Sequence, residues 1–512
     1  MENKKRLAIN MISVLVAFGL NMIINFFLSP YIIENVGVDA YGFVSLANNF
    51  VMYASILTIA LNSMAGRFIT VSIYKEDNEE TNKYFSSVLI VNYVASIVLL
   101  IPIIFLVIFL DKILNIPIGM ITDTKFLFAF IFLNFLLNII NSTYSIATFA
   151  MNRLDLSSRR NIDSSIIKAI LLFILFTFLS PRISYIGIAT CAMSLYLLIW
   201  NIRYTKKLLP QIKISCKYFE ISKIIEIIKS GIWNTITKLG QTLSDGLDLL
   251  ICNLFINSET MGQLSIAKTF SAIVSNLLAT VSNVFSPQIT IDYAKNEIDK
   301  LINNVKMSMK VTGCFANIPL SYLLVFGAFF YTTWIPNQDI KLISILTILT
   351  VQGEIISGAI TPLFNIFTVS NKVKVDAIVR LCTGFITVAI VFVFVKFTNL
   401  GIYAVAGTSI VLGTLVNLIF VPIYVSKKCL NIKWYTFYPI ILRYILTTVI
   451  LIIVLILFVR PLFKISNWIN IIISVFVVGI VGLCINILLL FSNKEKKEVL
   501  NTIKNRITNK NN

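Results

Sequence analysis

The sequence contains no histidine, and only 13% of its 512 residues are charged. Without histidine the chain lacks the usual general base, the commonest metal ligand and any histidine proton relay. No Walker motif is present, which argues against direct ATP coupling by this chain. The cysteines form no CxxC pair, and we interpret them as packing residues and not as disulfides or metal ligands. The seven are Cys191, Cys216, Cys252, Cys314, Cys382, Cys429 and Cys484.

Apolar residues are what the sequence has in abundance, at 57% of the chain, with 12% aromatic. This composition indicates an all-α polytopic membrane protein. Runs of about 20 apolar residues, the length that crosses a bilayer, predict fourteen helices. They lie near 9–33, 43–70, 85–110, 125–150, 162–180, 184–203, 229–256, 261–290, 305–333, 341–368, 373–396, 400–425, 440–462 and 467–491. The first lacks a small-residue cleavage site, so we expect it to be retained.

The net charge of +19 could indicate nucleic-acid binding, but the basic residues lie in short segments between apolar runs. The positive-inside rule explains this pattern better, and it predicts no nucleic-acid partner. It places both termini and most basic residues on the cytoplasmic side of the cell membrane. The basic residues left outside are Lys112, Lys125, Arg182, Lys341, Lys396, Arg460 and Lys464.

An internal repeat predicts how the helices are grouped. Residues 41–77 and 261–297 align without gaps at nine identical positions, among them Gly42/Gly262 and Ser45/Ser265. Six predicted helices separate the copies, so both halves enter the membrane in the same direction as a parallel repeat. We therefore predict two six-helix lobes and two extra C-terminal helices. The predicted divisions are a lobe at 1–204, a cytoplasmic linker at 205–228, a lobe at 229–426, helices thirteen and fourteen at 427–492, and a basic cytoplasmic tail at 493–512.

Charged residues within the predicted seventh and eighth helices are the main candidate site. Lys238, Gln241, Asp245 and Asp248 are spaced to share one helix face, and Lys268 follows on the next helix. A charge at bilayer depth costs at least about 2.5 kcal/mol, so such residues usually face a protein or aqueous interior. One interpretation is a structural ion pair between Asp248 and Lys268. The other is a polar cavity in which lysines attract an anionic head group and carboxylates bind a cation or relay protons.

Three further charges have two interpretations each. Glu354, in the middle of the tenth helix, is either a structural contact or an ion-coupling group. Arg380 has Asp376 four residues earlier, which favours a local helix pair, and it is also close enough to the cytoplasm for its side chain to snorkel there. Arg67 ends the predicted second helix as an inner-face anchor or lies at the inward mouth of a cavity.

The first lobe, by contrast, shows no deep charge but many asparagines. Interhelical hydrogen bonding explains them, although amide groups also read sugar hydroxyls. They are Asn21, Asn25, Asn48, Asn49, Asn62, Asn134, Asn138 and Asn141. The interiors of helices thirteen and fourteen are nearly uncharged, as in 446–459, which fits either a lipid-facing position or a groove for a long lipid tail.

The stretch from Tyr41-Gly42-Phe43 to Ala60-Leu61-Asn62-Ser63-Met64-Ala65-Gly66-Arg67-Phe68-Ile69 resembles the second helix of Wzx-type polysaccharide flippases. These belong to the superfamily that contains the MATE exporters and the MurJ flippases, and the predicted topology fits over the whole chain. The resemblance implies a flippase, not an enzyme, that moves an undecaprenyl-diphosphate-linked oligosaccharide across the bilayer by alternating access. Polysaccharide polymerase and assembly proteins would be its partners, in O-antigen or capsule synthesis.

In such relatives a cationic cavity receives the diphosphate. The positions that match by chemistry are Lys238, Lys268, Arg67 and Arg380. No cofactor is implied, and coupling to a Na⁺ or H⁺ gradient or to the membrane potential stays open. The candidates for ion coupling are Gln241, Asp245, Asp248, Glu354, Asn21 and Asn25.

Two other functions compete with the flippase. A MATE-like, cation-coupled exporter of drugs or small molecules is the first alternative, although fourteen predicted helices in place of twelve count against it. A membrane glycan polymerase or ligase is the second. It would need an acidic or arginine-rich outer loop, whereas the longest predicted outer connection is 111–124.

Overall fold

The computed structural model describes residues 16, 19, 22–24, 26–151, 153–463, 467–493 and 495–496. These residues form helices and connecting turns, and no strand occurs among them. Asn21 and Asn25 lie outside the described residues, as does most of the predicted tail. The predicted all-α fold is confirmed.

Twelve helices in the described part of the chain are long and apolar enough to cross a membrane. They are built on α2 (Val38–Tyr74), α3 (Asn78–Ile108), α5 (Ile121–Ala150), α6 (Leu154–Phe178), α7 (Ser184–Leu208), α10 (Ser258–Ala294), α11 (Ile298–Trp334), α12 (Ile340–Ile360), α14 (Val373–Phe397), α15 (Ile402–Leu415), α17 (Tyr438–Val454) and α18 (Trp468–Leu490). The short helix α4 (Leu110–Ile113) lies between two of them, whereas α13 (Phe364–Val369) and α16 (Val421–Tyr424) continue the spans that begin with α12 and α15. The remaining two predicted spans correspond to the first helix, described from residue 26, and to the interrupted helix Ile221–Phe255.

The helix boundaries support the predicted repeat. α2 and α10 are both 37 residues long, and each begins and ends 220 positions from the other. The turns that follow them also correspond, because Glu76 and Asn296 adopt left-handed φ angles of 58° and 57°. At the start of the repeat Ser265 Oγ donates to Ser45 Oγ over 2.5 Å.

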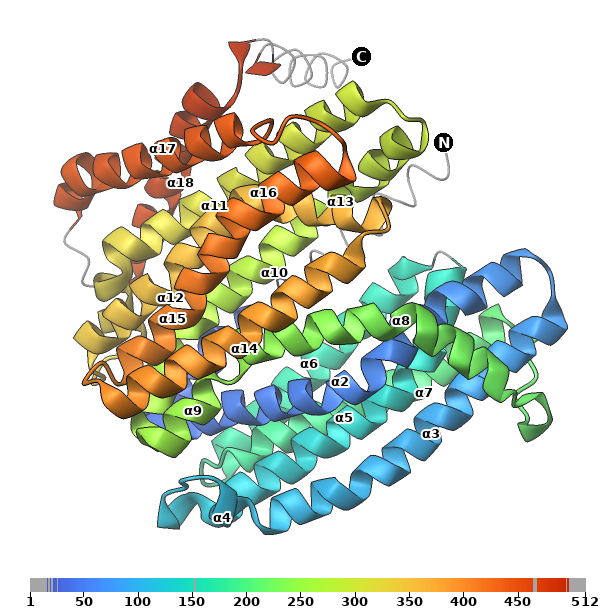
Figure 1. Ribbon diagram of the computed structural model, residues 1–512. Helices are drawn as coiled ribbons and strands as arrows, with labels where there is room; N and C mark the ends of the chain where they lie inside the picture. The colour runs from blue at the N-terminus through green and yellow to red at the C-terminus, as the bar shows by residue number, and fades with distance from the viewer. Residues whose placement is uncertain are drawn as a thin grey trace, which may run out of the picture. The chain divides into compact units, whose positions relative to one another are not determined.

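The chain forms two compact units. The first runs to Ser265 and includes Ala377–Ala389, and the second contains Ile266–Asp376 and the residues from Ile390 onward. In the first unit α2 packs against α3, α5 and α8 (Ile221–Gln241), and α5 packs against α7 (Figure 1). α8 and α9 (Asp248–Phe255), which we expected in the second lobe, therefore pack with the first. The compact units do not divide at the predicted linker.

The segment between α7 and α8 is attached to α3. The backbone N–H of Lys213 donates to Asn82 Oδ1 over 2.8 Å, and that of Glu220 donates to Ser87 Oγ over 2.8 Å. Lys223 Nζ lies 2.9 Å from Glu80 Oε1. These contacts satisfy backbone groups that a free linker would leave to water, so this segment is docked along most of its length.

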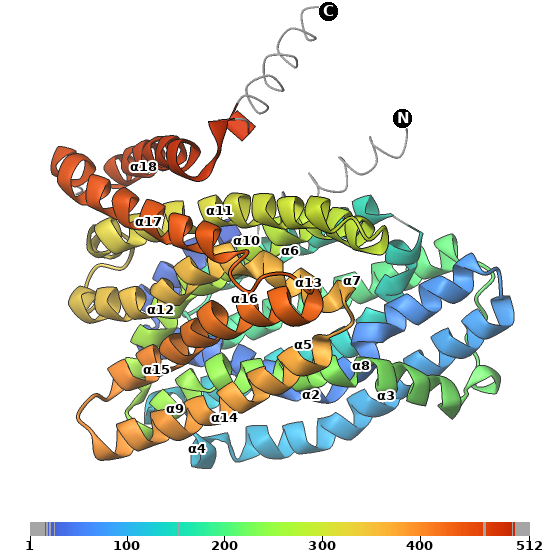
Figure 2. The same ribbon diagram turned by 45° about the horizontal axis from the view of Figure 1, so that its top comes forward.

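In the second unit the last two long helices pack against α11. Figure 2 shows α17 and α18 beside it. Asn317 of α11 and Asn486 of α18 exchange buried side-chain hydrogen bonds of 2.9 and 3.0 Å, and Asn317 also donates to Thr448 Oγ1 of α17. The outward faces remain apolar, as at Leu446 and Phe476, which are 61% and 70% exposed. This is the pattern expected of helices that face lipid on one side.

Candidate functional site

The predicted seventh helix is interrupted by a π-helical turn. Thr242–Gly246 forms this turn between α8 and α9. The carbonyl oxygen of Gly246 accepts hydrogen bonds from Asn49 Nδ2 at 3.2 Å and from Tyr53 Oη at 2.5 Å, both on α2. A π turn contains one extra residue, and such turns occur frequently at functional sites. The two α2 side chains hold this one in place.

The π turn divides the polar stripe that the sequence predicted. Gln241 and Asp245 are exposed, Lys238 is partly buried, and Asp248 is buried at 4% exposure. The π turn interrupts the regular α-helical spacing from which the common face was predicted, because its extra residue changes the direction of the residues that follow. The common face of these four residues stays a prediction.

α8 and α14 meet at two glycines within the first unit. A Cβ atom added to Gly240 would lie 2.6 Å from the backbone carbon of Arg380, and one added to Gly384 would lie 2.7 Å from the Gly240 oxygen. The two helix backbones are therefore in contact, as small residues permit in membrane proteins. Two predicted cationic residues belong to this region. Arg380 is part of the crossing, and Lys238 lies two residues before Gly240. The sequence analysis did not use the glycines, although small residues inside apolar runs are a signal for helix crossings.

α8 also crosses α2 closely. A Cβ on Gly231 would lie 1.9 Å from the Ala60 oxygen, and Asn234 Nδ2 donates to Ser63 Oγ over 3.2 Å. Because Gly246 contacts the earlier part of α2, the two helices run antiparallel. Arg67 lies one turn beyond Ser63 and is exposed. Arg67 and Lys238 therefore lie on opposite sides of this contact.

Two predicted site residues belong to the second unit. Lys268 is partly buried on α10. Glu354 of α12 accepts a hydrogen bond from Ser275 Oγ of α10, so at least one of its contacts is structural. The expected ion pair between Asp248 and Lys268 joins residues of different units and stays a prediction.

Lys168 of α6 bears on the expectation that the first lobe has no deep charge, and that expectation stays a prediction. α6 begins at Leu154, eight residues before the predicted start, because its first turns are polar and the hydropathy pattern did not reveal them. Lys168 is therefore about 21 Å along the helix at 1.5 Å per residue, and it is partly buried. It is a cationic residue at mid-helix that the sequence analysis assigned to the cytoplasmic end.

The asparagines of the first unit join helices to one another. Asn92 Nδ2 donates to Asn62 Oδ1 over 2.9 Å, and Asn138 Nδ2 donates to Ser194 Oγ over 3.2 Å. Asn201 donates in the same way to Asn141. Interhelical hydrogen bonding, the simpler of the two interpretations, is confirmed for these residues. These hydrogen bonds account for the asparagines without a role in binding sugar hydroxyls.

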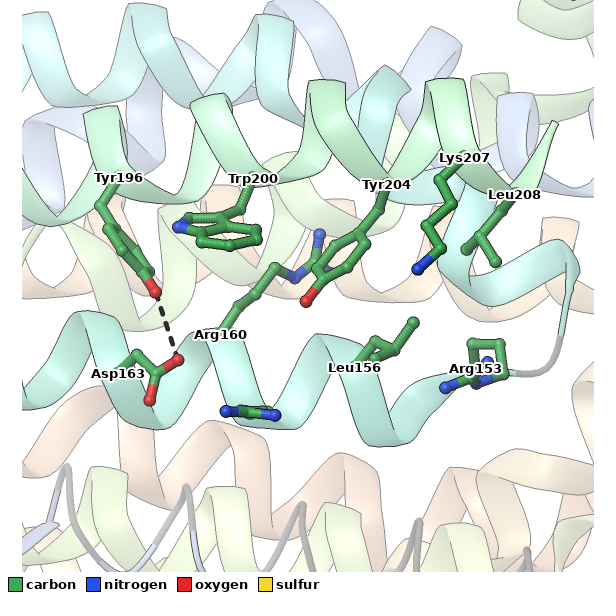
Figure 3. A pocket seen from close by; sticks show the side chains of 10 residues that line it. Arg153, Leu156, Arg160, Asp163, Tyr196, Trp200, Tyr204, Lys207 and Leu208 are labelled. Atoms are coloured by element: carbon green, nitrogen blue, oxygen red, sulfur yellow. Dashed lines mark hydrogen bonds between the residues drawn. The ribbon is translucent and has the colours of Figure 1, made fainter. Parts of the chain in front are cut away.

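A cationic pocket between α6 and α7 is the part of the molecule that the sequence analysis did not anticipate (Figure 3). Its volume is about 370 Å³. Four cationic side chains, one carboxylate and three aromatic rings line it. The lining residues are Arg153, Leu156, Arg159, Arg160, Asp163, Tyr196, Trp200, Tyr204, Lys207 and Leu208. The missed signal was the pairing of basic residues at the start of one helix with an aromatic row on the next.

Comparison with known proteins decides the family. Residues 7–291, more than half of the chain, match the family described as "Polysaccharide biosynthesis protein". The chain belongs to this family. A relative in Bacillus subtilis (strain 168), the uncharacterized membrane protein EpsK, is 28% identical over 422 residues, which cover 82% of this chain and 83% of EpsK.

Solved structures establish the fold of this family member. It is similar to the lipid II flippase MurJ in an inward closed conformation, with a TM-score of 0.66 and 17% identity over 94% of this chain and 98% of MurJ. It is also similar to an inward-facing MATE multidrug transporter, with a TM-score of 0.63 and 14% identity over 81% of this chain and 95% of the transporter. The chain is thus a multi-pass membrane protein with the fold that the MurJ flippase and the MATE transporter share.

Proposed function

We propose that this protein is a flippase that moves an undecaprenyl-diphosphate-linked oligosaccharide from the cytoplasmic to the outer leaflet of the cell membrane. It would work by alternating access and supply a cell-surface polysaccharide, with a polymerase and assembly proteins acting afterwards. The observation that carries the proposal is the crossing of α8 and α14 in a member of a polysaccharide biosynthesis family, because Arg380 is part of that crossing and Lys238 lies two residues from it in the sequence. A diphosphate carries more than one negative charge and is suited to recognition by two cationic side chains.

The remaining predicted residues take supporting roles in this proposal. Arg67 and Lys268 supply further positive charge along the substrate's route. Asp245, Asp248 and Glu354 are proposed to couple transport to a Na⁺ or H⁺ gradient, and Gln241 lines the route beside them. No covalent chemistry and no cofactor are required, because the substrate crosses unchanged and a gradient or the membrane potential supplies the energy.

Cells that lack the protein provide the test. The lipid-linked oligosaccharide is extracted, and its leaflet is determined by its access to an impermeant glycan-modifying enzyme. Complete oligosaccharide held on the cytoplasmic side is the expected result. Outer-leaflet units that stay unpolymerised would favour a polymerase instead. An unaffected glycan pathway would reject the flippase and favour small-molecule export, which the similarity to MATE transporters would then explain.

A further inference from the structure

The pocket between α6 and α7 is built from one end of each helix. The aromatic residues Tyr196, Trp200 and Tyr204 follow one another at intervals of four on α7 and form one wall. Arg160 and Asp163 project from α6 on the opposite side (Figure 3). All of the lining belongs to the first unit, so the pocket lies within one compact unit.

Arg160 is the most buried charge of the pocket. It is 2% exposed, its Nη2 lies 3.3 Å from Thr148 Oγ1, and its guanidinium carbon lies 5.0 Å from the centre of the Tyr204 ring. Its Nε and Nη1 atoms are buried without a hydrogen-bond partner in the described chain. Two unsatisfied donors on a buried guanidinium are costly, and an anion that accepts both of them would remove that cost.

The carboxylates nearby do not supply this anion. Asp155 is engaged by Arg153, with Nη2 and Oδ2 2.9 Å apart. Asp163, the one carboxylate in the lining, accepts a hydrogen bond from Tyr196 Oη over 3.2 Å. The described residues provide no ion pair for Arg159 or Lys207 either. The pocket therefore holds more positive charge than its own carboxylates balance.

The setting of the pocket indicates a lipid. Ile170 and Ile174 follow Asp163 by seven and eleven residues, which places them on the same face of α6. They are 54% and 45% exposed. A phosphate in the pocket would thus lie at the end of an apolar strip that could carry an acyl chain. The charge distribution predicts that this end is cytoplasmic, where basic residues meet anionic head groups.

We propose that this pocket binds the phosphodiester head group of an anionic phospholipid from the surrounding leaflet. Arg160 donates Nε–H and Nη1–H to phosphate oxygens, while Arg159 and Lys207 add positive charge at the mouth. Trp200 and Tyr204 line the head-group space, and the acyl chains follow Ile170 and Ile174 along α6. The site is distinct from the Lys238 region and does not depend on the proposed flippase activity.

The test uses the full chain, purified in mild detergent and analysed by native mass spectrometry. Short-chain phosphatidylglycerol, short-chain phosphatidylcholine and inorganic phosphate are added separately. The variants are Arg160→Gln and the double variant Arg159→Gln/Lys207→Gln. The side chains of Arg159 and Lys207 are exposed, so their replacement should not disturb folding. Lys206→Gln is the matched control, because Lys206 is an exposed cation on the same turn that does not line the pocket.

We expect phosphatidylglycerol to bind at least about tenfold more tightly than phosphatidylcholine, because its head group lacks the choline cation that Arg159 and Lys207 repel, and we expect Arg160→Gln to weaken the binding of phosphatidylglycerol by about tenfold. The double variant should weaken binding by about thirtyfold, since two basic residues contribute about 1 kcal/mol each, and Lys206→Gln should leave it unchanged. Equal binding of the two lipids would overturn the proposal. Unchanged affinity for phosphatidylglycerol in both Arg160→Gln and the folded double variant would also overturn it, as would binding of inorganic phosphate without a preference for the lipid.

Discussion

Lys238 is partly buried on α8, two residues before the glycine at which α8 touches α14. Because it is a cation close to this crossing, it is the charge whose removal we expect to affect transport most directly. Hydrogen bonds to charged groups contribute about 1.5–3 kcal/mol, which corresponds to about tenfold or more in affinity. We expect removal of the charge of Lys268, which belongs to the second unit, to affect transport in the same way.

We predict that Lys238→Ala and Lys268→Ala each reduce glycan export by about tenfold while the protein still inserts into the membrane. Export is measured as surface polysaccharide, and insertion as the amount of protein in the membrane fraction. Lys238→Arg, which keeps the charge, should retain much of the export. Lys341→Ala is the control, since Lys341 is exposed at the start of α12. Normal export in the double alanine variant would reject the role assigned to these lysines.

At the scale of elements, the contact of α8 with α14 depends on the absence of a side chain at Gly240. A methyl group there would overlap backbone atoms of Arg380 at 2.6 Å. Overpacking of this kind typically costs about 1–3 kcal/mol. We predict that Gly240→Ala lowers both the thermal stability and the export activity. Gly407→Ala on α15 is the matched control, because the space beside Gly407 is open and its φ is not left-handed. Equal thermal stability and equal export activity in Gly240→Ala and Gly407→Ala would contradict the close contact.

The attachment of α18 depends on a buried pair of amides. Asn486→Leu leaves the amide of Asn317 without its main partner inside the second unit. Interhelical hydrogen bonds in membrane proteins contribute about 0.6–1.7 kcal/mol, so we expect a loss of that size in the free energy of unfolding. The double variant Asn317→Leu/Asn486→Leu should recover part of it, because no amide is then left unsatisfied. A strictly additive loss would show that the pair does not act as a unit.

Docking of the α7–α8 segment should depend on pH. Hydrogen bonding from the Ser222 hydroxyl, with help from Lys83 and Lys223, holds the pKa of Glu220 below its usual range. A lowered pKa means that the ionised carboxylate favours the docked form. This contribution is complete above the ordinary glutamate pKa of about 4.3 and is lost as the pH falls through the lowered value.

Hydrogen exchange of residues 209–220, corrected for intrinsic rates, measures this effect. We expect protection to fall between pH 6 and pH values well below about 4.3. Glu220→Gln should abolish that change while preserving the backbone bond to Ser87. Protection that falls equally in the variant would assign the pH dependence to other groups.

Sequence periodicity predicted the long helices well, because a span of apolar residues is a local property. It placed the start of α6 eight residues late, since the polar first turns of that helix resemble a loop, and it therefore missed the mid-helix position of Lys168. The π turn at Thr242–Gly246 could not be read from spacing. It depends on Asn49 and Tyr53, which are distant in sequence.

At the scale of the whole chain, the repeat links sequence to fold most strongly. Nine identities at a constant offset predicted two copies, and the copies indeed share helix lengths and the left-handed residues of their turns. What the repeat could not predict is how the chain divides into compact units, because that depends on which helices pack together. α8 and α9 follow the predicted linker but belong with α2.

The central claim is that this chain moves a lipid-linked oligosaccharide between leaflets. The most direct measurement reconstitutes the purified protein into liposomes that carry undecaprenyl-diphosphate-linked oligosaccharide on one leaflet. Access of an impermeant glycan-modifying enzyme to the other leaflet is then followed over time. We predict transfer with the intact protein under an ion gradient or membrane potential, and strongly reduced transfer with Lys238→Ala. No transfer by the folded protein under any applied gradient or potential would contradict the account.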